Sequence, residues 1–167
     1  MIHNTSFSQY IPPQDFHALA VTNLTVAAGQ VAGTICIHKA AAAETITLNV
    51  PLVLPSNSNA LNGSKLVSVE LDYEILVAAC TSVTLSIVKV ARGLDTAVAV
   101  VSAPAGTQLL LPASTAATVN KHKDKFTLTT PEWVLNTSYY FLKALFVCPG
   151  TTTLDILAAV ANYTFRA

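Results

Sequence analysis

Residues 65–77 read K-L-V-S-V-E-L-D-Y-E-I-L-V, and apolar and polar side chains alternate along this stretch. A β-strand has a side-chain period of two, so this order directs one set to each face of a strand, whereas a helix would scatter both sets around its axis. We expect the apolar set to face the core; it consists of Val67, Val69, Leu71, Tyr73, Ile75 and Val77. The stretch therefore predicts a half-buried strand.

Further short apolar segments, separated by Gly and Pro, extend this pattern along the chain, and no segment reads as a helix of normal length. The candidate strands are residues 34–38, 45–54, 82–91, 95–102, 109–111, 126–130, 138–148 and 153–166. Many short strands without intervening helices predict an all-β chain, a two-sheet antiparallel β-sandwich. An eight-stranded jelly roll is the first expectation, and an immunoglobulin-type sandwich is the alternative. Residues 138–148 and 153–166 are apolar on both faces, which predicts central strands or strands covered by another subunit.

The chain is expected to divide into an extended N-terminal arm, residues 1–30, and a sandwich domain, residues 31–167. Pro12 and Pro13 withhold two N–H donors, which favours a segment that runs over a surface or a neighbouring molecule. Deleting the arm is therefore expected to leave a folded sandwich.

Charge is scarce in this chain of 167 residues: 11% of the residues are charged, 52% are hydrophobic, and the net charge is zero. A neutral surface lacks the field that holds nucleic acid or an anionic membrane, so neither is expected as a partner. Neutral surfaces associate readily, and part of the apolar excess is expected to be buried between subunits. No stretch resembles a signal peptide or a membrane span.

Reactive side chains do not cluster in the sequence. Cys36, Cys80 and Cys148 lie far apart in predicted strands, which predicts buried free thiols. The four histidines lack metal-ligand spacing, so no metal and no cofactor is expected. Residues 121–125 read as a solvated, charged loop.

One acidic row, Glu70, Asp72 and Glu74, shares a face of the strand at 65–77. Carboxylates at positions i and i+2 lie roughly 6–7 Å apart, which a glycosidase could use. The competing interpretations are a solvated face, with cross-strand partners among Lys89, Arg92 and Lys143, and a calcium or interface ladder. The solvated face is favoured, and no enzymatic activity is expected.

Three stretches resemble small β-rich virion proteins of bacteriophages: K-L-V-S-V-E-L-D-Y-E-I at 65–75, S-V-T-L-S-I-V-K-V at 82–90, and A-V-A-N-Y-T-F-R-A at 159–167. The resemblance implies a non-enzymatic decoration, vertex or fibre-base protein, commonly a homotrimer, that is made in the host cytoplasm and attaches to other virion or shell proteins. The arm and the last two strands would then form the contacts with other subunits or the shell. The residues expected there are Tyr10, Pro12, Pro13, Phe16, Tyr139, Tyr140, Phe146, Tyr163 and Phe165.

A carbohydrate-binding module that recognises host glycans is the alternative. Tyr10, Trp133, Tyr139 and Tyr140 are aromatic side chains that could stack on sugar rings, provided that they are exposed. Because Tyr139 and Tyr140 are adjacent in a predicted strand, one of them must face outward or into a partner. Trp133 and Tyr140 are the residues expected to bind sugar.

Overall fold

The computed structural model describes residues 4–19, 23–28, 35–55, 63–91, 100–111 and 120–166. Strands dominate this part of the chain, beside a single 3-10 turn, η1 (Pro13–Asp15). The strands are β1 (Asn4–Ile11), β2 (His17–Leu19), β3 (Leu24–Ala28), β4 (Ile35–Lys39), β5 (Glu44–Leu52), β6 (Ser64–Val77), β7 (Ser82–Ala91), β8 (Val100–Ser102), β9 (Gly106–Leu111), β10 (Asn120–Trp133), β11 (Ser138–Cys148) and β12 (Thr153–Arg166). The predicted all-β class is confirmed.

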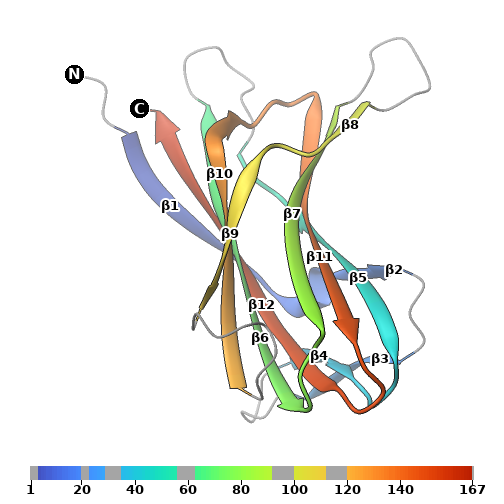
Figure 1. Ribbon diagram of the computed structural model, residues 1–167. Coiled ribbons are helices and arrows are strands. Elements are labelled where there is room, and N and C mark those ends of the chain that lie inside the picture. Colours follow the sequence, from blue (N-terminus) through green and yellow to red (C-terminus); the bar gives the residue numbers. More distant parts are fainter. Residues whose placement is uncertain are drawn as a thin grey trace.

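Two antiparallel sheets form the sandwich (Figure 1). Sheet A has the order β3-β4-β12-β6-β10-β9, with β1 paired to β12, and sheet B has the order β2-β5-β11-β7-β8. Eight of these strands form the two four-stranded sheets of a jelly roll, as predicted: β4-β12-β6-β10 in sheet A and β5-β11-β7-β8 in sheet B. The remaining strands β1, β2, β3 and β9 extend the edges. Strands β11 and β12 lie inside their sheets, which confirms their predicted central position.

Strand β6 confirms most of the predicted alternation and corrects its two ends. Val69, Leu71, Tyr73 and Ile75 are buried. Toward the start of the strand, Leu66 replaces Val67 in the core, because Ser68 and Leu66 pair with the adjacent residues Asn162 and Tyr163 of β12. Val67 is thus the extra residue of a β-bulge, which shifts the alternation by one. Val77 is exposed at the other end.

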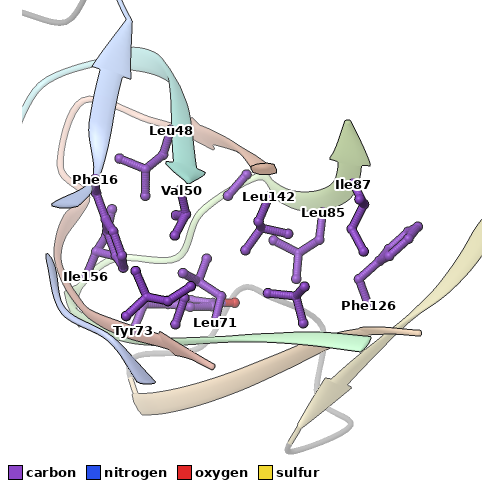
Figure 2. Packing of buried hydrophobic residues seen from close by; sticks show 14 of the residues in the cluster. Phe16, Leu48, Val50, Leu71, Tyr73, Leu85, Ile87, Phe126, Leu142 and Ile156 are labelled. Atoms are coloured by element: carbon purple, nitrogen blue, oxygen red, sulfur yellow. The ribbon is translucent and has the colours of Figure 1, made fainter. Parts of the chain in front are cut away.

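The core lies between the sheets, where inward side chains of β6 and β12 meet those of β5, β7 and β11 (Figure 2). Figure 2 shows Leu71, Tyr73 and Ile156 from sheet A opposite Leu48 and Leu142 from sheet B. All five side chains are almost completely buried. Full burial of such a side chain contributes roughly 1.5–3 kcal/mol, so this layer accounts for much of the stability of the fold.

The N-terminal residues belong to the sandwich, which differs from the expected division into a 1–30 arm and a 31–167 domain. Strand β1 pairs with β12 along all eight of its residues, β2 pairs with β5, and β3 pairs with β4. Ile11 and Phe16 are part of the buried core. Pro12 and the η1 turn that begins at Pro13 carry the chain from sheet A to sheet B. The Pro-Pro step therefore ends a strand and redirects the chain within one molecule.

Candidate functional site

The outer face of sheet A carries the acidic row, which is paired with a row of lysines on β10. Lys125 Nζ lies 3.1 Å from Glu70 Oε1, and Lys123 Nζ lies 3.8 Å from Asp72 Oδ1. Lys125 and Lys123 are the cross-strand neighbours of Glu70 and Asp72 in the register of β10 and β6. The arrangement is a ladder of ion pairs on a partly exposed face.

The partners expected for the acidic row were wrong in two cases. Lys89 and Lys143 belong to sheet B, and Lys89 Nζ lies 2.9 Å from Glu132 Oε2. The third expected partner, Arg92, lies outside the described residues. Residues 95–99 of the expected strand 95–102 also lie outside them. The error arose because residues 121–125 form the start of β10 instead of a loop. Their alternation places polar His122 and Asp124 in the interior, which reverses the usual pattern.

Asp72 is predicted to destabilise the folded protein at neutral pH. Burial raises the pKa of this carboxyl group, with Lys123 opposing the shift and Glu70 adding to it, and Asp72 Oδ1 has no hydrogen-bond partner. A carboxyl group whose pKa is raised by folding costs stability above its unfolded pKa of about 3.9 and nothing below it. We expect Asp72→Asn to melt about 2–4 °C higher at pH 7, for a gain of ~1 kcal/mol, with the difference absent at pH 2. Thermal unfolding at both pH values tests this; a lower melting temperature at pH 7 would contradict it.

Buried polar groups join the two sheets on the side of β7 and β10. Tyr73 Oη donates a hydrogen bond to Asp124 Oδ2 at 3.0 Å, and the ring of His122 stacks on Tyr73 with centroids 5.0 Å apart. Gln108 of β9 donates to Asp124 Oδ2 and to the Val83 carbonyl oxygen of β7. Burial raises the pKa of Tyr73, so this phenol stays protonated and serves as a donor. The network connects strands and lines none of the clefts described below.

A cleft of about 500 Å³ lies on the outer face of sheet B, between β2, β5, β11 and the segment that precedes β11. The register of the strands brings its residues together: His17 of β2 lies opposite Asn49 of β5, and Phe141 of β11 lies opposite Pro51 of β5. Tyr139 is 53% exposed at this site. The lining consists of His17, Asn49, Pro51, Leu52, Val53, Leu54, Val134, Leu135, Asn136, Ser138, Tyr139, Tyr140 and Phe141. None of these is Asp, Glu, Lys or Arg.

The two residues expected to bind sugar are poorly placed for it. Tyr140 is 2% exposed, and its hydroxyl donates to the Trp133 carbonyl oxygen at 2.9 Å. Trp133 is half-buried beneath Lys65 Nζ, which lies 4.5 Å from the ring centroid, and it does not line the cleft. Tyr139 is the member of the Tyr139–Tyr140 pair that faces outward. Sequence reasoning missed His17 and Asn49, because only the strand register places them beside Tyr139.

The residues expected at subunit contacts fall into two groups. Phe16, Tyr140 and Phe146 are buried in the core of their own chain, so they are corrected to core residues, and Pro13 is also buried. Tyr10 and Tyr139 are exposed, while Pro12, Tyr163 and Phe165 are half-buried. Phe16 points inward from the position that follows η1, and Tyr140 and Phe146 point inward from alternate positions of β11.

Near both chain ends, β1 lies beside the C-terminal half of β12 (Figure 1). Phe7 of β1 stacks on Tyr163 with ring centroids 5.8 Å apart, and it meets the edge of Phe165 at 5.9 Å. Phe7 is nevertheless 45% exposed. Among the described strands, β12 is the one partner of β1, so the opposite edge of β1 is open. We call this open edge with Phe7, Tyr163 and Phe165 the β1 surface.

Other functional chemistry has little support in the described part of the chain. It contains no group of three or more His, Cys, Asp or Glu side chains that could hold a metal ion. It also contains no helix long and apolar enough to cross a membrane. Cys36, Cys80 and Cys148 are buried and free, as predicted.

No family model matches the sequence, and no curated protein matches it. Among solved structures, the family 11 carbohydrate-binding module from Clostridium thermocellum, in complex with a β-1,3-1,4-mixed-linked tetrasaccharide, is similar with a TM-score of 0.36 and 6% sequence identity. The similarity covers 95% of this chain and 87% of that chain. At this TM-score it indicates nothing about what the present chain binds.

Proposed function

We propose that the chain is a non-enzymatic structural protein of a bacteriophage virion, which assembles as a symmetric oligomer, a trimer, and attaches to the particle. The resemblance of residues 65–75, 82–90 and 159–167 to small phage virion proteins supports the particle and the trimer. Jelly rolls occur in viral capsid proteins and in lectins, so the fold is compatible with this role without selecting it. The observation that carries the assembly is the β1 surface.

An open strand edge offers unpaired N–H and C=O groups to another chain, and soluble proteins usually protect such edges with charges, prolines or bulges. Strand β1 has the sequence N-T-S-F-S-Q-Y-I, which contains no charged residue and no proline. Its pairing with β12 is regular along its length. A second copy of the chain could therefore add a strand here and cover Phe7, and repetition of such a contact around an axis closes a ring.

Substitution of Phe7 tests this surface. We expect Phe7→Lys to shift the oligomer toward the monomer, because a lysine ammonium would lose water in the contact without gaining a partner. Val26→Lys is the control, because Val26 is an exposed apolar side chain, 70% exposed, that lies on β3 outside the β1 surface. Light scattering on eluted protein gives both masses, and circular dichroism verifies the fold. Equal masses for Phe7→Lys and the wild-type oligomer would remove the β1 surface from the contact.

A carbohydrate-binding module that recognises the host surface is the second candidate. The cleft beside Tyr139 favours it, because ligand sites are typically concave, mostly apolar, and supplied with a few polar groups that fix the ligand. The cleft and the β1 surface involve different residues, so a virion protein could use both. Binding of the chain to an array of glycans tests this candidate, and the absence of any binding would dismiss it.

A further inference from the structure

We infer that Cys80 and Cys148 form a redox-active thiol pair, which hydrogen peroxide oxidises to a disulfide within one chain. Neither cysteine lines the cleft on sheet B or belongs to the β1 surface, so this modification site depends on neither proposed function.

The two sulfur atoms already touch. Cys80 Sγ lies 3.5 Å from Cys148 Sγ, and both thiols are buried. A disulfide bond of about 2.05 Å requires a further approach of about 1.5 Å, which side-chain rotation and a small shift of the connection at residues 78–81 can provide. The backbones are also held together here, because the Thr81 N–H donates a hydrogen bond to the Val147 carbonyl oxygen at 2.8 Å.

A buried ammonium group accompanies the pair. Lys39 is completely buried, and its Nζ donates a hydrogen bond to the Thr152 carbonyl oxygen at 2.9 Å and further hydrogen bonds to two other carbonyl oxygens. The Thr152 hydroxyl donates to the carbonyl oxygen of Ala79, the residue before Cys80. A hydrogen bond from the Cys80 S–H and the charge of Lys39 lower the pKa of the Cys148 thiol, against the opposing effects of burial and a carboxylate. Cys148 is therefore the attacking sulfur, because the thiolate is the nucleophilic form.

The oxidation balances with one molecule of hydrogen peroxide. The Cys148 thiolate attacks one peroxide oxygen, the O–O bond breaks, and the leaving hydroxide takes up the proton that Cys148 has lost, which gives a sulfenic acid and water. The Cys80 sulfur then attacks the Cys148 sulfur, the S–O bond breaks, and the second hydroxide leaves as water with the Cys80 proton. The two sulfur atoms lose the two electrons that the peroxide oxygens gain. Peroxide is small enough to reach thiols that lie one residue beneath the exposed Thr81 and Pro149.

The bond would join parts of the sandwich that are distant in the chain. Cys80 lies in the connection from β6 of sheet A to β7 of sheet B, and Cys148 ends β11, a central strand of sheet B. A disulfide that closes so long a loop restricts the unfolded chain and thereby stabilises the folded one. The oxidised protein should melt about 5–15 °C higher than the reduced protein, and a thiol reductant should reverse the shift.

The test treats the full chain, freed of reductant, with a small excess of hydrogen peroxide. We expect the free thiols counted in denaturant to fall from three to one, and peptide mapping to join residues 80 and 148 within one chain. Cys36→Ala is the control and should still form the bond, because Cys36 lies on β4 with its sulfur atom 3.9 Å from the Ala28 carbonyl oxygen. Cys148→Ala should form no disulfide and show no rise in melting temperature. Cys80→Ala should accumulate a sulfenic acid at Cys148, which a dicarbonyl probe captures.

Three free thiols in the wild-type chain after peroxide treatment would overturn the inference, as would a bond to Cys36 or between two chains. Mapping of the wild-type chain decides this even where a variant fails to fold. An oxidised chain that carries the bond but melts no higher would refute the stabilising effect. Capture of a sulfenic acid at Cys80 in Cys148→Ala, and none at Cys148 in Cys80→Ala, would reverse the order of attack.

Discussion

A chain that starts at residue 17, and therefore lacks β1 and η1, is expected to fail to fold. The loss of residues 1–16 removes the buried side chains of Ile11 and Phe16 and exposes the edge of β12 along eight residue pairs. Deleting one such core side chain typically costs about 2–5 kcal/mol, and the whole stability of a domain is about 5–15 kcal/mol. Circular dichroism and the dispersion of proton NMR signals report the outcome.

This expectation replaces the one drawn from the sequence, in which residues 1–30 were a dispensable arm. Tyr10→Ala is the control, because Tyr10 lies in the deleted segment but is 62% exposed, so this variant should fold. A truncated chain with the same cooperative melting as the full chain would show that β1 and Phe16 are accessory to the sandwich.

Phe146→Ala is expected to lower the free energy of unfolding by about 3–5 kcal/mol, the usual cost of truncating a buried phenylalanine. Phe146 is completely buried, and Tyr73 packs against it edge to face with ring centroids 5.3 Å apart. Urea unfolding measures the change. Tyr139→Ala on the same strand is the control and should fall within about 1 kcal/mol of the wild type, since substitutions of exposed residues usually have small effects.

The same variant decides between two roles for Phe146. Truncating a core residue lowers the free energy of unfolding in every oligomeric state. Truncating a subunit-contact residue would leave the unfolding of the monomer unchanged and weaken the oligomer. The second result would restore Phe146 to the interface where the sequence had placed it.

Strands with a regular apolar and polar alternation could be predicted from the sequence, because a core on one face imposes a period of two. Residues 65–77 and 82–91 show this, and the succession of short apolar segments without intervening helices was sufficient to favour a jelly roll. The prediction failed where a local feature breaks the period. The bulge at Val67 shifts the register by one residue, and the inward-facing His122 and Asp124 make the start of β10 look like a polar loop.

The candidate sites depend on long-range pairing, which no local pattern reveals. His17 and Asn49 become neighbours because β2 aligns with β5, and Tyr139 joins them because β11 lies on the other side of β5. The open edge of β1 is likewise a property of the sheet order. Sequence composition leads to the expectation that apolar surface is shared between subunits, but it does not locate that surface.

The mass of the wild-type protein in solution tests the proposed assembly most directly. Size-exclusion chromatography with light scattering is expected to give three times the 17.6 kDa of the chain at micromolar concentration. A single species of 17.6 kDa across that concentration range would contradict the account, because the β1 surface would then have no second copy to cover it.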